Sequence, residues 1–445
     1  MHNAHDLTTG NIPSLIRKLA IPASIGFFFH TMFNVVDTYY GGLVSTEALA
    51  ALSLSFPIFF IVIALSSGIG TGATALISNA LGEKNKIEAR EYAGQAISFG
   101  IIVGIILTVI GLLLSPSLFR LLGASGTYLT TALEYMNVIF YGAIFFIINQ
   151  MLNSSLSAIG DTKSFRNFLV VGFFLNVILD PWFLFGGYGL PAMGFAGIAW
   201  ATILIQFMGT IYLTIRCVHE NIIGNDWRQR LKPNLSYYKK IASQGFPASL
   251  NMMTIAIGIF VIIYFVGWFG KHAVAAYGIG TRIEQIALLP MIGLNMATLA
   301  IAGQNNGAKM HERVVETWKT ALRYGIMVVA FGFVVVFFAA PFLMRLFSND
   351  TEVIEIGTTY LHFASFISIA YVLMFITIAA LQAMKKPLFA VFIGAYRQII
   401  APVIIFYLLA LVLGFGLSDI WWGIFIVNWS AAVITLLYGK RVMNL

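Results

Sequence analysis

The sequence has 445 residues, of which 59% are hydrophobic and 10% charged, with a formal net charge of +8 and a mean hydropathy of +0.87. Soluble domains contain about 25% charged residues, so this composition excludes an ordinary soluble enzyme and indicates a polytopic membrane protein. The single cysteine, Cys217, excludes an internal disulfide and a cysteine-built metal site.

Twelve apolar segments are long enough to cross a bilayer, which takes about 20 residues. In chain order they lie near 14–41, 48–80, 92–114, 129–158, 167–187, 195–216, 240–267, 273–306, 319–343, 355–383, 389–413 and 420–440. The sequence therefore predicts an all-α integral membrane protein with twelve transmembrane helices.

Basic residues are concentrated in every second loop. Of the 26 Lys and Arg, 21 lie in one set of loops, and only Arg120, Lys271 and Arg345 lie in the other. Basic loops stay cytoplasmic, so we expect both termini on the cytoplasmic side. The positive charge is then a consequence of topology, and we expect membrane lipid and no nucleic acid as a partner.

The second half of the sequence repeats the first at one constant offset. The tripeptide at Pro22 reappears at Pro247, and by the same offset Gly68 corresponds to Gly293. The chain is therefore expected to form two pseudo-symmetric six-helix lobes, 1–216 and 240–445, joined by a polar cytoplasmic linker at 217–239. Parallel repeats of this kind occur in secondary transporters.

Two buried acids break this symmetry. Asp37, in "FNVVDTYYGG", corresponds to Ile262, and Asp180, in "LNVILDPWF", corresponds to isoleucines at 404–405. Both acids belong to inside-to-outside spans and lie at similar depth. Asn176 is one helical turn before Asp180 and shares its face. Carboxylates inside a membrane are expensive, and they commonly bind protons or ions.

Other oxygens are expected near these acids. Asn34 precedes Asp37 by three residues, and Pro181 leaves the carbonyl of Val177 without its helical donor. The resulting oxygens suit a proton, or Na⁺ at Asp37, Asn176 and Asp180. The alternative interpretation is that both acids are hydrogen-bonded fixtures of helix packing.

The pattern resembles the multidrug and toxic compound extrusion (MATE) family over nearly the whole chain. The resemblance lies in the two six-helix lobes, Pro22 with Asp37, "GDTK" at 160–163, "NVILDP" in the fifth span and "GIAWAT" ending at Thr202. It is closest to the DinF-type branch. The NorM-type branch has acids in spans seven and ten, and this sequence has none there.

The DinF-type resemblance implies a coupling site at Asp37, Asn176 and Asp180, with Thr202 as a neighbour and Asn153 in the same cavity. Asn34 and His30 are further candidates for the cavity, and His30 has the alternative role of a packed core histidine. The resemblance also implies that span one bends near Pro22, although the matching Pro247 fits a fixed kink equally well.

Three charged residues lie in spans of the second lobe: Arg282 and Glu284 in span eight, and Arg397 in span eleven. Residues two apart on a helix do not face each other, so each needs another partner. We expect an ion pair between Glu284 and Arg397 with a structural or gating role, and a second coupling site is the alternative.

The resemblance implies a multidrug efflux antiporter of the bacterial inner membrane that exports cationic amphipathic drugs or toxins in exchange for H⁺ or Na⁺. It would work as a monomer by alternating access, and it would be neither an enzyme nor dependent on a cofactor. The alternative is a flippase for lipids or lipid-linked oligosaccharides on a related two-lobe fold.

Overall fold

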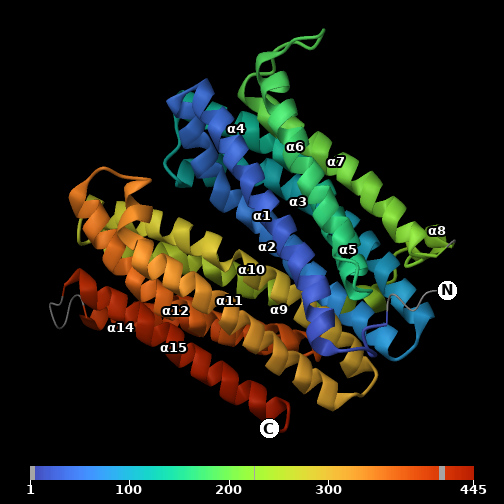
Figure 1. Cartoon of the computed structure of the whole chain (residues 1–445). Helices are drawn as coiled ribbons and strands as arrows, with labels where there is room; N and C mark the ends of the chain where they lie inside the picture. Colours follow the sequence, from blue (N-terminus) through green and yellow to red (C-terminus); the bar gives the residue numbers. More distant parts are fainter. Residues whose placement is uncertain (1–5, 225, 410–415) are drawn as a thin grey trace. The chain divides into compact units, whose positions relative to one another are not determined.

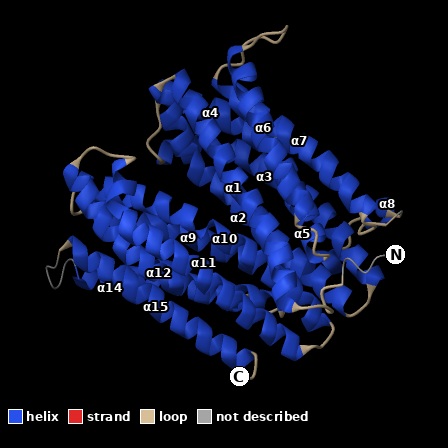
Figure 2. Cartoon of the chain, in the orientation of Figure 1, coloured by secondary structure: helices blue, strands red, loops and turns tan. Residues whose placement is uncertain are grey.

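The computed structural model describes residues 6–224, 226–409 and 416–445. Helices account for nearly all of this part of the chain (Figure 2). The one extended pairing among the described residues is an isolated bridge between Gly187 and Leu190.

The first half of the chain forms seven long or medium helices and one short one (Figure 1). They are α1 (Ile12–Val44), α2 (Thr46–Gly82), α3 (Lys86–Leu121), α4 (Gly126–Tyr141), α5 (Ala143–Ala158), α6 (Lys163–Phe185), α7 (Phe195–His219) and α8 (Trp227–Arg230).

The second half forms a matching series. It consists of α9 (Leu235–Gly267), α10 (Lys271–Gly307), α11 (His311–Arg345), α12 (Thr351–Ala383), α13 (Leu388–Ala395), the π-helix η1 (Tyr396–Ile400), α14 (Ala401–Tyr407) and α15 (Leu417–Val442). The predicted span at 389–413 corresponds to α13, η1 and α14, and its last residues, 410–413, lie outside the described part.

The helix bounds in the two halves of the chain repeat at the same offset as the sequence, the offset that aligns Pro22 with Pro247. At this offset α2 and α10 have the same first and last positions, α3 and α11 have the same first position, and so do α6 and α13. Polar N-caps help to set these starts: the Ser45 and Asn85 side chains accept from the amides of Ala48 and Glu88 at 3.0 and 3.1 Å.

The predicted all-α membrane fold with twelve spans is confirmed. Eleven of the described helical segments are long and apolar enough to cross a membrane, and α4 with α5 forms a twelfth that is bent by 44°. The bend lies at Gly142, where a Cβ atom would collide with the side chain of Ile203 on α7. Large apolar side chains such as Leu113 and Phe331 are exposed, as expected for lipid-facing positions.

The chain divides into two compact units, and the division falls inside helices. Unit 1 contains Ile25–Ser249, and unit 2 contains Leu7–Ser24 and Leu250–Leu445. α1 and α9 therefore each contribute to both units. Pro22 and Pro247 lie two residues before these matching division points.

The linker of the sequence prediction is held against α3 in unit 1. The Gln95 side chain donates to the carbonyls of Arg230 and Lys232 at 2.7 and 2.8 Å. The Arg230 guanidinium pairs with Asp226 at 2.7 Å and with Glu91 at 2.9 Å. This Arg230 hydrogen bond holds the pKa of Asp226 below its ordinary value.

The "GDTK" stretch has a structural explanation. Gly160 has φ +83°, a conformation that favours glycine. Asp161 then accepts from the Ser164 amide at 3.0 Å at the start of α6. Asp161 also pairs with Arg216 of α7 at 3.4 Å, so this motif joins two helices of unit 1.

Candidate functional site

Unit 1 brings Asp37 of α1 and Asp180 of α6 to the same amide group. The Asn176 Nδ2 atom donates to Asp37 Oδ1 and to Asp180 Oδ1, each at 2.8 Å. Asp37 is 7% exposed, and Asn176 and Asp180 are fully buried. The three residues that the sequence grouped by spacing are therefore in direct contact.

This cluster has more acceptors than donors. Among the described residues, Asn176 Oδ1 and Asp180 Oδ2 are buried without a hydrogen-bond partner. The two carboxyl groups share the single amide group of Asn176. Unpaired buried acceptors cost free energy, so the arrangement favours binding of a proton or a small cation.

The local structure of α6 explains how the cluster is presented. Asn176 and Asp180 are four residues apart and share one helix face. Pro181 has no N–H for the carbonyl of Val177. The hydroxyl of Tyr40 on α1 donates to that carbonyl at 3.4 Å, which joins α1 and α6 a second time.

Tyr135 of α4 lies beside this cluster, and the sequence analysis did not predict it as a site residue. It is 9% exposed and lies close enough to interact electrostatically with both Asp37 and Asp180. Its ring stacks on Phe195 at a centroid distance of 5.2 Å. One signal was present in the sequence, because Tyr135 matches Tyr360 in the repeat.

Four other candidate residues make hydrogen bonds or ring contacts away from the acids. The Thr202 hydroxyl donates to its own helix at 3.1 Å, and Asn153 accepts from Ser157 Oγ at 3.2 Å. The exposed Asn34 side chain donates to the His30 carbonyl at 2.9 Å, and the His30 ring contacts that of Phe27. Their predicted roles in the cavity stay predictions.

Pro22 lies in the part of α1 that belongs to unit 2. Just beyond it, the Ser24 hydroxyl donates to the carbonyls of Ala20 and Pro290 at 2.9 and 3.3 Å. In unit 1, the matching Ser249 hydroxyl donates to the Leu65 carbonyl at 3.3 Å. The serines that follow the two prolines thus make matching contacts, and the hinge role of Pro22 stays a prediction.

In unit 2, the expected ion pair between Glu284 and Arg397 is not formed. Glu284 Oε2 instead accepts from the Tyr360 hydroxyl at 2.7 Å. The Arg397 side chain, on the π-helix η1, donates to Asn428 Oδ1 at 3.1 Å and its guanidinium lies 5.3 Å from the ring centre of Tyr371. Tyr371 is within interaction range of both charged groups.

Arg282 does not join this group. Its residue position is exposed on α10, and Glu284, two residues later, is partly buried. The spacing argument that these two side chains face different directions therefore agrees with their burial.

Comparisons with known proteins are consistent along the whole chain. The MatE family model matches residues 22–182 and 247–408, once in each repeat. The "Probable multidrug resistance protein NorM" of Thermotoga maritima is 30% identical over 346 residues, 76% of this chain and 73% of that protein. An FAD transporter of Shewanella oneidensis is 28% identical over 409 residues, 90% of this chain and 88% of that protein.

A solved structure gives the same result for the fold. It is described as the outward-facing conformation of a multidrug resistance MATE family transporter of the MOP superfamily. It is 25% identical to this chain, has a TM-score of 0.91, and the match covers 100% of this chain and 98% of the other.

Proposed function

The chain belongs to the MatE family of membrane transporters, and on that premise we propose that it is an antiporter that exports amphipathic organic cations in exchange for protons. Family membership makes it a transporter rather than an enzyme. The multidrug resistance name of the Thermotoga relative supports small-molecule drugs as substrates.

The acid pair of unit 1 is the observation on which this proposal depends. Asp37 Oδ1 and Asp180 Oδ1 each lie 2.8 Å from the same nitrogen, so they are separated by at most twice that distance. Two full charges there would repel each other by about 3 kcal/mol at an effective dielectric constant of about 20. This repulsion therefore raises the equilibrium constant for binding one positive charge by a factor of roughly 150.

The proposed cycle uses this capture. In the outward-facing state the pair takes up a proton from outside as the drug leaves. Neutralising the pair lowers the free energy of the inward-facing state, in which the proton is released and a new drug cation binds. Exchange of one proton for one monovalent drug cation moves no net charge across the membrane, so the pH gradient drives it, and each pH unit can sustain a roughly tenfold drug gradient.

Bending of α1 near Pro22 is part of this proposal. Pro22 removes one hydrogen bond inside α1, which lowers the energy needed to bend the helix. Asp37 lies several turns further along the same helix. Protonation of Asp37 would release its charge-assisted contact with Asn176 and so permit α1 to move against α6.

The coupling ion and the substrate are separate questions for experiment. The unpartnered oxygens of Asn176 and Asp180 also suit Na⁺. The Shewanella relative is named for FAD, which is anionic, and a lipid flippase is a further alternative. The alternating loop charge supports a location in the bacterial inner membrane with both termini in the cytoplasm.

The test uses purified protein in liposomes with a fluorescent cationic dye. A pH gradient and a Na⁺ gradient are imposed separately on wild type, Asp37→Asn and the control Thr38→Val. Thr38 is the next residue of α1, and its exposed hydroxyl donates only to the Asn34 carbonyl, at 2.8 Å. We expect the pH gradient to drive dye transport in wild type and Thr38→Val and not in Asp37→Asn.

Dye transport by Asp37→Asn at the wild-type rate would contradict the proposed role of the acid pair. Transport driven by Na⁺ alone would make the same residues cation ligands. If neither gradient moves dye, the next assay is transfer of an undecaprenyl-linked sugar, which would support the flippase.

A further inference from the structure

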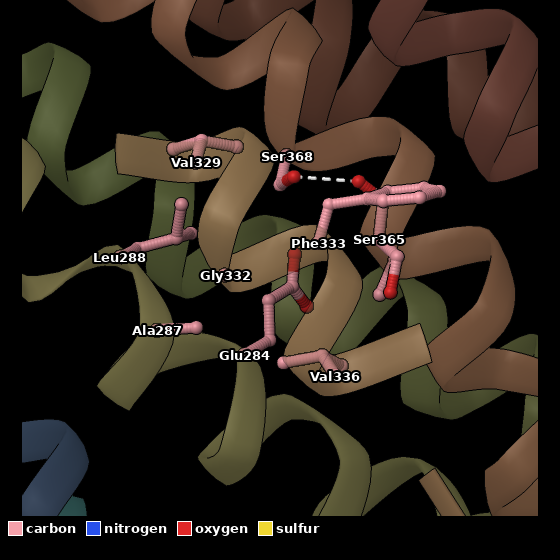
Figure 3. Close-up of a pocket in the computed structure, with 10 residues that line it drawn as sticks. Glu284, Ala287, Leu288, Val329, Gly332, Phe333, Val336, Ser365 and Ser368 are labelled. Carbon is pink, nitrogen blue, oxygen red and sulfur yellow. Dashed lines mark hydrogen bonds between the residues drawn. The ribbon is translucent and has the colours of Figure 1, made fainter. Parts of the chain in front are cut away.

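The pocket of unit 2 between α10, α11 and α12 presents no group that would orient a polar ligand. Its walls are almost wholly apolar. Figure 3 shows the Ser368 hydroxyl directed at the Ser365 carbonyl of the same helix, and Glu284 accepts from the Tyr360 hydroxyl at 2.7 Å. Charged side chains without a partner lie instead on the linker of unit 1.

The linker is fixed at the depth where the apolar part of α3 begins. The Ser98 hydroxyl of α3 donates to the Leu231 carbonyl at 2.7 Å, and Gln95 holds the linker one turn earlier on the same helix. Directly beyond Ser98, the sequence of α3 is apolar over 99–114 apart from Thr108. An apolar run of this kind lies in the hydrocarbon core of a bilayer. The docked linker is therefore at the level of the lipid headgroups.

Three basic side chains of the linker are exposed and carry charge that no acid neutralises. They are the linker cations, Arg228, Lys232 and Lys239. None of the three forms an ion pair in the part of the chain that the structure describes, whereas the neighbouring Arg230 and Lys240 have acidic partners. Arg228 and Lys232 are one turn apart, on α8 and on the turn that follows it. The linker thus presents positive charge at headgroup level.

Large apolar side chains are exposed beside the linker cations. Trp227 and Leu235 are 41% and 67% exposed, and the Arg228 guanidinium lies 5.4 Å from the centre of the Trp227 ring. Ile87, whose carbonyl accepts from the Arg230 guanidinium at 3.3 Å, is exposed on the first turn of α3. Tryptophan beside basic residues is typical of the membrane–water interface, where the ring lies among headgroups and the cations contact phosphates.

The repeat shows that docking alone does not need these cations. The corresponding segment of unit 2, directly before α1, is also held by bonds between side chains and its backbone. The Leu7 amide donates to the Gln304 side chain at 2.9 Å, and the Leu7 carbonyl accepts from Asn305 at 3.0 Å. Leu7 is buried and occupies the repeat position of Lys232, and residues 1–16 contain no Lys or Arg. The linker cations are therefore an addition to a shared docking scheme.

We propose that the linker of unit 1 binds anionic phospholipid, with Arg228, Lys232 and Lys239 contacting phosphate groups and Trp227 anchored among the headgroups. Positive-inside topology accounts for basic residues anywhere in this loop. A lipid site needs them at headgroup level beside an interfacial aromatic side chain, which is where they lie. Each basic side chain near an anionic membrane surface raises affinity about fivefold. This surface is separate from the acid pair, and lipid binding to it does not depend on transport.

The experiment is native mass spectrometry of the full-length protein in detergent micelles, which gives the affinity for the first lipid bound. The probes are phosphatidylglycerol, which is anionic, and phosphatidylcholine, which is zwitterionic, with the same acyl chains. The neutral linker variant combines Arg228→Gln, Lys232→Gln and Lys239→Gln. A charge-retaining linker variant combines Arg228→Lys, Lys232→Arg and Lys239→Arg.

The matched control removes the same charge from unit 2. It combines three substitutions at exposed basic residues, Lys386→Gln, Lys440→Gln and Arg441→Gln. We expect phosphatidylglycerol to bind the wild type, the charge-retaining variant and this control with similar affinity. The neutral linker variant should bind it at least about tenfold more weakly, because three attractive charges are lost. Phosphatidylcholine should bind the wild type at least about tenfold more weakly than phosphatidylglycerol.

Four results would overturn the proposal. They are equal affinity of the wild type for the two lipids, undiminished phosphatidylglycerol binding by the neutral linker variant, an equal loss in the unit 2 control, and displacement of the lipid by excess glycerol phosphate at constant ionic strength. The third would assign binding to diffuse surface charge, and the fourth to a soluble phosphate. The comparison of the two lipids uses the wild type alone, so it does not depend on the folding of any variant.

The outcome is also distinguishable from failure of the proposed function. Selective phosphatidylglycerol binding at the linker without gradient-driven dye transport would keep the lipid site and reject the antiporter. Dye transport by a protein that does not discriminate between the two lipids would keep the antiporter and reject the lipid site.

Discussion

Replacing Asn176 with leucine tests whether its amide group holds two carboxyl groups together. The variant loses two hydrogen bonds of 2.8 Å at buried acceptors. A hydrogen bond to a charged group contributes about 1.5–3 kcal/mol, and one to a neutral group about 1 kcal/mol. Asn176→Leu should therefore destabilise the protein by about 2.5–4 kcal/mol with one carboxyl group ionised, and by about 2 kcal/mol with both protonated.

The assay is thermal unfolding of the detergent-solubilised protein at pH 5 and pH 9. The loss of stability should be larger at pH 9, because the acid pair then carries a negative charge that the amide stabilises. Asn149→Leu is the matched control. The Asn149 amide donates to the backbone and side-chain oxygens of Gln206 at 2.9 and 2.8 Å. These acceptors do not titrate, so the loss of stability in Asn149→Leu should be the same at both pH values.

The reasoning also predicts a coupling between substitutions. In an Asp37→Asn background, one of the two acceptors of Asn176 is a neutral amide oxygen, so the effect of Asn176→Leu should shrink by about 0.5–2 kcal/mol. Equal losses at both pH values, or equal losses in both backgrounds, would refute the view that Asn176 acts on a charged pair.

Two further predictions concern the scaffold. Arg230→Ala should expose the linker to protease, and limited proteolysis at neutral pH should show several-fold faster cleavage of the linker. In the wild type, Arg230 lowers the pKa of Asp226 below its ordinary 3.8. The contact between Arg230 and Asp226 should therefore persist down to about pH 4 and weaken only below it. Gly68→Ala should lower the free energy of unfolding by about 1–3 kcal/mol, because the new methyl group overlaps the α9 backbone. Gly278 has open space around the position of its absent Cβ, so Gly278→Ala should raise the free energy of unfolding by about 0.5–1 kcal/mol in the same thermal assay.

The repeat made most of the fold predictable. Apolar runs located the spans, and the constant offset between the repeats showed which helices correspond. The helix ends were harder to predict from the sequence, because an apolar run stops at the membrane boundary while the helix continues beyond it. α3 begins at Lys86, six residues before its predicted span, because Asn85 caps it in water.

The division of α1 and α9 between the units was not predictable from hydropathy. An apolar pattern gives the depth and length of a helix and not its neighbours. The division after Ser24 and Ser249 follows from packing partners such as the Pro290 carbonyl, which is far from Ser24 in the sequence and contacts its hydroxyl in the fold.

The acid cluster was predictable where the evidence was local. Asn176 and Asp180 share a helix face by spacing, and similar depth placed Asp37 near them. Tyr135 was missed because its approach to the acids depends on how α4 is rotated against α1 and α6. The absent Glu284–Arg397 pair has the same origin: the π-helix at Arg397 changes the direction of that side chain, and sequence periodicity assumes a regular α-helix.

The matching tyrosines show that each unit places a tyrosine from the same repeat position beside a carboxyl group. Tyr135 in unit 1 lies beside Asp37 and Asp180, and Tyr360 in unit 2 donates to Glu284 at 2.7 Å. The acids come from different helices, α1 and α6 in one unit and α10 in the other. Since the repeat preserves the tyrosine while the acids change position, the tyrosine belongs to the shared framework and the acids are specific to each unit. The positions where the two repeats disagree are therefore the informative ones, and they lead to the same places as the geometry: the amide that two acids share in unit 1, and Glu284 with its tyrosine donor in unit 2.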